Sequence, residues 1–512
     1  SEVNVKVLSI RSASFAVFVL AVAVLGLHAD DAAQDTPVPA ASPAGLAAPA
    51  GRASAAGEIA PGPELPDPRA TPGAHRPAFW MAAAVLLAVY GVIASELLHR
   101  TLAAFVGAAA ILFISYTLGT FDPGYRILTF AQAVEAIDLN VVFLLLSMMI
   151  IVGITMRTGL FQWLAYKAYQ ISRGNAFALA AILMGVTALA SSFLDNVTTM
   201  MLIIPVTLRI AAVLRISPVT LLLPEVFASN VGGTATLIGD PPNIMIGSFA
   251  GLTFVDFIVH LTLVCVLALA VSGVYFWYWF RKDYAAAHVE DVEGTILQLR
   301  AAYGITDRKL LVYCGVAIGL TILLFFLHGV LEMEASVAAM TGAALLLVLS
   351  RVEIVDILKE EIEWPILVFF MMLFVVVAAA EQTGLIQVIA DWVHDASGGS
   401  LLLATVVVLW VSAVVSSVVD NIPFTATMLP VVAYLTRTVP GAGDGILWWA
   451  LALGACLGGN ATLIGASANV VTVGFAEREG HHISFRQYLE VAAVPTLITL
   501  VLATLWLVAA GM

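Results

Sequence analysis

Two short acidic motifs in this sequence carry the side chains best suited to bind an ion. In "SSFLDNVTTMMLIIP" the pair Asp195–Asn196 interrupts an apolar run, and in "SSVVDNIPFTATMLP" the pair Asp420–Asn421 does the same. A carboxylate, a carboxamide oxygen and the carbonyls freed where a helix breaks are ligands that suit a hard cation or a proton. The aspartates could alternatively only cap the helix that follows, by accepting its backbone N–H bonds. One residue can do both, so the motifs predict a site for Na+ or H+.

Two glycine-rich segments, "SNVGGTATLIGDPPNIMIG" (229–247) and "CLGGNATLIGASANVV" (456–471), lie where the surrounding apolar sequence predicts membrane helices. Glycine pairs and adjacent prolines break a helix, and Asp240 is costly in hydrocarbon. We expect each segment to be unwound, with its freed carbonyls, amides and threonine hydroxyls facing a bound ion. The alternative is a kinked helix whose small residues allow close packing. Packing alone explains neither Asp240 nor the asparagines that both segments share, Asn243 and Asn469.

Together, the acidic motifs and the glycine-rich segments define the candidate site for the substrate or ion. Its residues are Asp195, Asn196, Thr198, Thr199, Asn230, Gly232, Gly233, Thr234, Thr236, Asp240, Asn243, Asp420, Asn421, Thr425, Gly458, Gly459, Asn460, Thr462 and Asn469. Within this set, the candidate Na+ ligands are Asp195, Asn196, Asp420 and Asn421. We expect no cofactor beyond Na+ or H+ as the coupling ion.

The motifs occur as two copies of one unit. Asp420 follows Asp195 by 225 positions, and Gly458 follows Gly232 by 226. Because an almost constant offset across separate motifs does not arise by chance, the sequence indicates a duplication.

Composition places the chain among polytopic membrane proteins. Of its 512 residues 61% are hydrophobic and 11% are charged, and the mean hydropathy is +1.00. Apolar stretches near the length that spans a bilayer recur along it. There is no basic patch to bind nucleic acid, and there is neither a nucleophile–base pair nor a phosphate-binding loop. The sequence therefore argues against an enzyme and against an ATP-driven pump, and predicts an all-α protein in the lipid bilayer.

Charge sets the expected orientation in the plasma (inner) membrane. We treat 176–213 and 400–436 as re-entrant hairpins and let the first apolar run enter from the cytoplasm. All but five of the 22 lysines and arginines then lie inside, as the positive-inside rule requires. The five outside are Arg52, Arg69, Arg76, Arg126 and Arg437. An odd number of crossings separates the hairpins, so the second repeat is inverted relative to the first.

The expected organisation has four parts, of which the two membrane repeats each contain one hairpin and one broken helix. The parts are a signal-like or anchor segment with an Ala/Pro-rich disordered tether (1–78, with 30–78 extracytoplasmic), repeat 1 (79–285, hairpin 176–213, broken helix 219–250), a cytoplasmic linker (286–308) and repeat 2 (309–512, hairpin 400–436, broken helix 446–476).

The segments "NVGGTATLIGDPPN" and "GACLGGNATLIGASANVV", with the two acidic motifs, "HRTLAA" (99–104) and "KAYQISRG" (167–174), resemble the ion transporter superfamily. This superfamily contains arsenite permeases, sodium/proton antiporters and citrate transporters. The likeness is closest to the pink-eyed dilution, or melanosomal P, protein family. The resemblance implies a scaffold and a moving transport unit, a site at the hairpin tips and broken helices, a homodimer, and elevator-type alternating access. Where related dicarboxylate carriers have Ser-Asn-Thr at each tip, this chain has Asp-Asn-Val and Asp-Asn-Ile.

These observations together predict a secondary transporter. It would move a small ion (an inorganic or organic anion, or Na+) by symport or antiport with Na+ or H+. The alternative is an anion (chloride) channel of the melanosomal P protein type, which would pass ions down their own gradient without coupling to a second ion.

Overall fold

The computed structural model describes residues 77–95, 97–287 and 303–510, with 293, 294, 296 and 299 between the last two ranges. Every regular element in these ranges is a helix, and 8 helices are long and apolar enough to cross a membrane. The all-α polytopic fold is therefore confirmed. The expected anchor segment and tether lie almost wholly outside the described residues, and so does most of the expected linker 286–308.

Helices of the first half surround two breaks, one after Ser191 and one after Thr234. They are α2 (Pro77–Ser95), α3 (Arg100–Phe121), the 3-10 turn η2 (Pro123–Tyr125), α4 (Phe130–Glu135), α5 (Leu139–Met156), α6 (Leu160–Ser172), α7 (Ala176–Ser191), α8 (Asn196–Leu214), α9 (Val219–Thr234), α10 (Pro241–Ala250) and α11 (Phe254–Ala286).

The second half has corresponding breaks after Ser416 and Gly458. Its helices are α13 (Arg308–Leu327), α14 (Ala335–Ser350), α15 (Ile354–Glu360), α16 (Trp364–Gln382), α17 (Leu385–Ser397), α18 (Leu401–Ser416), α19 (Asn421–Thr438), the 3-10 turn η3 (Ala442–Asp444), α20 (Ile446–Gly458), α21 (Ser467–Arg478) and α22 (Phe485–Ala510).

The order and start of the helices follow the duplication seen in the sequence. Helices α5, α6, α7 and α8 begin at 139, 160, 176 and 196, and α16, α17, α18 and α19 begin at 364, 385, 401 and 421, each 225 positions later. In both halves a long apolar helix is followed by a short one that begins after a glycine in the left-handed region, Gly159 or Gly384. Glycine adopts this backbone with the least strain, so the sequence "TGL", at 158–160 and again at 383–385, marks the same turn in both halves.

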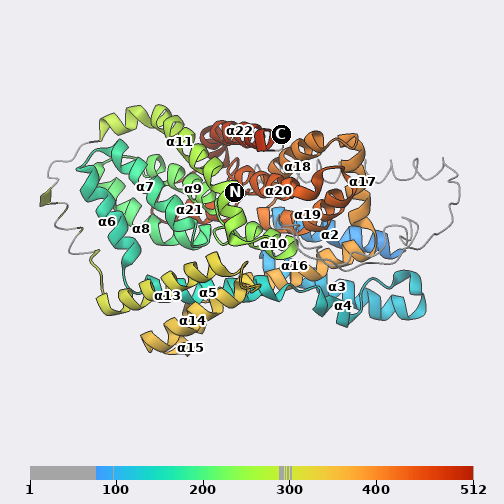
Figure 1. Cartoon of the computed structure of the whole chain (residues 1–512). Coiled ribbons are helices and arrows are strands. Elements are labelled where there is room, and N and C mark those ends of the chain that lie inside the picture. The colour runs from blue at the N-terminus through green and yellow to red at the C-terminus, as the bar shows by residue number, and fades with distance from the viewer. Residues whose placement is uncertain are drawn as a thin grey trace.

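The helices form two groups, which we call the scaffold layer (α2, α3, α5, α13, α14 and α16) and the core unit (α7–α11 and α18–α22). Within the scaffold layer α3 packs on α16 and α14 packs on α5; within the core unit α7 packs on α9 and α18 on α20. Figure 1 shows α3, α5, α13, α14 and α16 along one side of the molecule and the hairpins and broken helices on the other. The short helices α6 and α17 contact the hairpins at each end.

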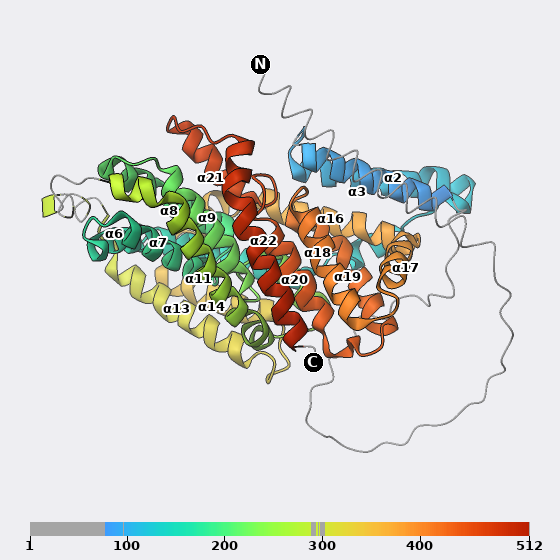
Figure 2. The same ribbon diagram turned by 90° about the horizontal axis from the view of Figure 1, so that it is seen from above.

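At the centre of the core unit, helices of one half pack against helices of the other half. Helix α8 contacts α21, and α19 contacts α10, so each hairpin meets the second part of the other half's broken helix. In Figure 2 α11 and α22 cross the middle of the molecule, with the first hairpin on one side and the second on the other. The first residues of four helices, α8, α10, α19 and α21, therefore lie inside the core unit.

The re-entrant nature of the hairpins stays a prediction. Helices α7 and α18 have 16 residues each, about 24 Å at 1.5 Å per residue, which is short for a hydrocarbon core of about 30 Å. Helix α8 (Asn196–Leu214) has 19 residues and is among the helices long enough to span.

Candidate ion-binding site

The tip of each hairpin is a helix start capped by the aspartate of its acidic motif. Asp195 accepts the backbone N–H of Thr198 at 2.9 Å, and Asp420 accepts that of Ile422 at 3.1 Å. Both side chains are half-buried. Because a carboxylate at a helix N-terminus is stabilised by the free N–H groups and by the helix dipole, capping accounts for part of the role of both aspartates.

The glycine-rich segments are unwound only in their middle, between Thr234 and Pro241 and between Gly458 and Ser467. The expectation that the pair Gly232–Gly233 breaks the first helix is wrong, because α9 continues through both glycines. One asparagine organises each unwound stretch. The Nδ2 of Asn243 donates to the carbonyls of Thr234 and Thr236 at 3.0 and 2.8 Å. The Nδ2 of Asn469 donates to the carbonyls of Gly459 and Thr462, both at 2.9 Å. These two asparagines thus satisfy carbonyls that the helix break has freed, as buried backbone groups require.

One threonine ties each unwound segment to the hairpin beside it. The hydroxyl of Thr236 donates to the carbonyl of Ser192 at 2.5 Å, and that of Thr462 donates to the carbonyl of Ser417 at 2.5 Å. The sequence predicted that both hydroxyls bind a ligand, but in this conformation each donates its proton to a backbone carbonyl. Thr234 likewise donates to the Asn230 carbonyl at 2.7 Å.

The candidate glycines have two different functions. A Cβ on Gly232 would lie 2.2 Å from the Ala188 carbonyl oxygen, and one on Gly458 would lie 2.4 Å from the Ala413 Cα. These glycines allow α9 and α20 to pack closely on the hairpins. Gly233 and Gly459 instead face the unwound segment, since a Cβ there would lie 2.6 and 2.8 Å from the carbonyl oxygens of Gly239 and Gly465.

Asn230 joins the two halves at the centre of the core unit. Its Oδ1 accepts from Asn196 Nδ2 at 3.1 Å, and its Nδ2 donates to the Oδ1 atoms of Asn460 and Asn469 at 2.9 and 3.0 Å. All four side chains are buried. Residues more than two hundred positions apart therefore form one amide network, which the repeated motifs alone did not reveal.

Three buried polar atoms in this region lack a hydrogen-bond partner in the described part of the chain. They are the Nδ2 of Asn460 and the hydroxyl oxygens of Thr199 and Thr425. Leaving a buried donor or acceptor unsatisfied costs about 1–3 kcal/mol. A bound ion or substrate with oxygen atoms would supply the missing partners.

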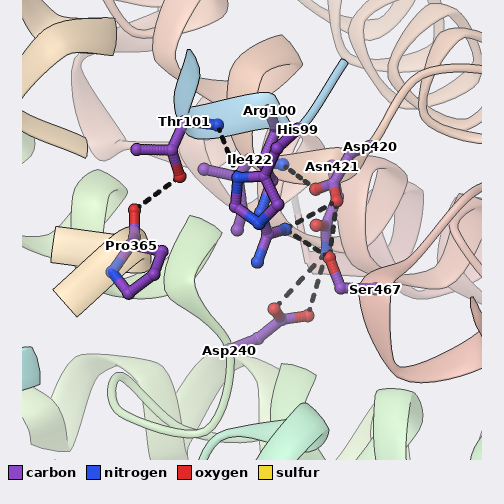
Figure 3. Close-up of polar contacts among 9 residues, drawn as sticks. All are labelled: His99, Arg100, Thr101, Asp240, Pro365, Asp420, Asn421, Ile422 and Ser467. Carbon is purple, nitrogen blue, oxygen red and sulfur yellow. Dashed lines mark hydrogen bonds and ion pairs between the residues drawn. The ribbon is translucent and has the colours of Figure 1, made fainter. Parts of the chain in front are cut away.

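Asp240 has the most unusual environment of the carboxylates in the site. It is 1% exposed and stands at the start of α10, yet its side chain caps no backbone N–H. Its oxygens accept from Asn421 Nδ2 at 3.3 and 3.4 Å (Figure 3), and it interacts electrostatically with Asp195 and Asp420. Among the described ion pairs none joins Asp240 to a basic side chain. A carboxylate so buried must hold a proton or a cation.

Arg100 was not among the residues singled out from the sequence, where it counted only as a cytoplasmic charge. It begins α3, and its Nη1 lies 3.2 Å from Asp420 Oδ2 and 2.6 Å from Ser467 Oγ (Figure 3). The hydroxyl of Ser467 donates to the same Asp420 oxygen at 2.6 Å. Its place in the "HRTLAA" segment was the one signal available.

Three of the four candidate Na+ ligands contact partners outside their own hairpin. Asn196 contacts Asn230, whereas Asn421 contacts Asp240, and Asp420 is paired with Arg100. The first and second acidic motifs are thus brought into one region, and the aspartates of both interact electrostatically with Asp240.

Breaks in apolar helices, lined by buried asparagines and aspartates and enclosed by membrane-spanning helices, define a transporter for a small solute. The chain belongs to the family described as "Citrate transporter", whose model matches residues 90–454.

Relatives in other organisms agree with this class. An "Uncharacterized transporter" of Mycobacterium tuberculosis is 41% identical over 430 residues, covering 83% of this chain and 97% of the relative. The "P protein" of Homo sapiens is 35% identical over 483 residues, covering 80% of this chain and 57% of the longer human protein. The likeness to this family that the sequence motifs indicated is therefore confirmed.

Among solved structures, the YdaH transporter of Alcanivorax borkumensis has a similar fold, with a TM-score of 0.51 and 16% identity over 81% of this chain and 98% of that one.

Proposed function

We propose that the protein is a secondary active transporter that couples the movement of a small anion to Na+ or H+. The observation that carries this proposal is Asp240, a carboxylate 1% exposed whose described polar partners are the Asn421 amide and the Cys456 thiol, with no basic side chain among them. A group of this kind binds and releases a cation or a proton as the site opens to water, which is what coupling requires.

The neutral donors of the site favour an anionic substrate. Four helix starts reach the core unit, and helix N-termini carry partial positive charge. The unpartnered Asn460 Nδ2 is a donor that needs an acceptor oxygen. With Asp240 neutralised by its cation or proton, the site would accept a carboxylate-bearing anion, and the family description makes citrate the first to test.

Movement of the core unit against the scaffold layer would give alternating access. The two groups pack extensively within themselves and meet through few helices, chiefly α16 with α19, α5 with α10 and α13 with α11. This separation supports an elevator-type movement. A homodimer in the plasma (inner) membrane, with the N-terminal tether outside, completes the proposal.

Uptake into proteoliposomes tests the function. Purified protein would be tested with citrate, arsenite, Cl− and Na+, under an imposed Na+ gradient or pH gradient. We expect saturable accumulation of one anion above its equilibrium level, driven by one of the two gradients. Flux that only follows the ion's own gradient would instead indicate a channel, and no flux of any tested ion would contradict the proposal.

A further inference from the structure

The contact between Arg100 and Asp420 joins the two helix groups. Arg100 belongs to the scaffold layer, whereas Asp420 and Ser467 belong to the core unit. The side chain of Arg100 is 21% exposed and that of Asp420 is 13% exposed. The guanidinium of Arg100 also lies over the Phe369 ring, 5.4 Å from its centroid. Figure 3 shows the guanidinium approaching the hairpin tip from α3. The pair is therefore a partly buried cation–carboxylate link across the boundary along which the two groups would move.

Among the residues that the structure describes, the second half has no equivalent of this cation. Helix α3 packs on α16 as α14 packs on α5, and α16 corresponds to α5 in the duplication, so α3 corresponds to α14. The first residue of α14 is Ala335, preceded by Glu334. Among the described residues no ion pair involves Asp195, the counterpart of Asp420. One hairpin tip is thus held by a scaffold cation and the other is not.

We propose that Arg100 is a positioning residue: a scaffold-borne counter-ion that holds Asp420 in the conformation seen here and releases it when the core unit moves. This inference rests on the proposed elevator function. A displacement of a few ångströms breaks a contact of 3.2 Å. Asp420 then needs another cation, because an unpaired carboxylate at membrane depth is costly. Asp420 can pair with Arg100 or bind a cation from solution, but not both. The second hairpin therefore stays in the conformation seen here until a cation replaces the guanidinium.

A cysteine pair away from the hairpin tips can report this conformation. Asn140 on α5 donates to Ser248 on α10 at 2.9 Å, and these residues lie on opposite sides of the same boundary. The Asn140→Cys/Ser248→Cys protein should form a disulfide under mild oxidation, whereas each single variant should not. The three native cysteines are buried and stay in place.

In this background, Arg100→Gln should lower the rate of disulfide formation about fivefold or more, the size expected for coupling between two states. Arg100→Lys should retain most of the rate. Asp420→Asn should match Arg100→Gln, and combining the two should add nothing. Arg157→Gln is the matched control, because Arg157 at the end of α5 pairs with Glu360 and Glu361 at the end of α15, neither of which belongs to the core unit. This variant should leave the rate unchanged.

Transport separates this role from direct substrate binding. We expect Arg100→Gln to change the maximal rate of uptake and leave the KM for citrate within about twofold. An unchanged disulfide rate with a raised KM would mean that Arg100 binds the substrate, and an unchanged rate with unchanged uptake would mean that the pair is only structural. Either result overturns the inference. The disulfide rate needs no substrate, so absence of uptake in the unmodified protein would count against the proposed function separately.

Discussion

Asn421 at the tip of the second hairpin donates its amide to both carboxylate oxygens of Asp240, at 3.3 and 3.4 Å, although the two residues are 181 positions apart. The duplication does not repeat this contact. At the position that corresponds to Asp240 the second half has Ala466, and Asn196, the counterpart of Asn421, contacts Asn230 instead. The two halves therefore share a backbone plan and differ in the side chain that most needs a cation.

Asp195→Asn should separate capping from ion coupling. Asparagine caps a helix about as well as aspartate, so thermal stability should stay within about 0.5 kcal/mol, while the removal of the titratable charge should abolish or uncouple uptake. Asp307→Asn is the control, because Asp307 caps α13 through the N–H groups of Lys309 and Leu310 at 2.8 and 3.0 Å outside the site. If both variants transport with unchanged pH and Na+ dependence, Asp195 is only a cap.

Gly232→Ala should destabilise the fold. The new Cβ would meet the backbone of Ala188 at 2.2–2.7 Å, and overpacking of this kind costs about 1–3 kcal/mol. Gly185→Ala is the matched control, since a Cβ there has nothing within 4 Å. Thermal unfolding in detergent measures the difference; equal melting of the two variants would contradict the close packing of α7 on α9.

Gly233→Ala should act on transport more than on folding. A Cβ at this position would lie 2.6 Å from the Gly239 carbonyl oxygen, inside the unwound segment, and would shift the backbone next to the site. We expect folded protein at normal levels with uptake reduced at least about tenfold, as small displacements in a binding site produce. Gly474→Ala, with open space around it, should transport normally. Normal uptake by a Gly233→Val/Gly459→Val protein would reduce both segments to helix packing.

Single cysteines at the ends of the first hairpin should test its topology. Arg173 ends α6 and Arg215 ends α8, so they flank the two arms of the hairpin. A re-entrant hairpin places both on the cytoplasmic side, and an impermeant thiol reagent should label Arg173→Cys and Arg215→Cys only from that side. Arg437→Cys should be labelled from outside. Labelling of the first two from opposite sides would make the first hairpin a full crossing.

Much of the helix plan could be predicted from the sequence because it depends on local signals. The breaks fall at Asp195, Asp420 and the two glycine-rich segments, where caps and helix breakers act within a few residues. The asparagines at the start of α10 and α21 lie at the predicted breaks for the same reason.

The contacts that distinguish one carboxylate from another could not be predicted. Whether an aspartate caps a helix depends on the geometry of its side chain. Asp195 and Asp420 each accept a backbone N–H at a helix start, whereas Asp240 accepts none. The pairing of Arg100 with Asp420 spans 320 positions, and in the described ranges Asp195, the counterpart of Asp420, has no such ion pair. The repeat therefore gave no second example from which to infer it.

Gradient-driven citrate uptake by the Asp240→Asn protein tests the central claim most directly. The variant keeps the size of the side chain and its bond to Asn421 but cannot bind or release a proton and holds a cation weakly. The control is Glu334→Gln, an exposed carboxylate outside the network. In proteoliposomes with an imposed Na+ or pH gradient, we predict accumulation by the unmodified and control proteins and none above equilibrium by Asp240→Asn, which should be at least as thermally stable. Accumulation by Asp240→Asn equal to that of the unmodified protein under both gradients would contradict the claim that Asp240 carries the coupling ion.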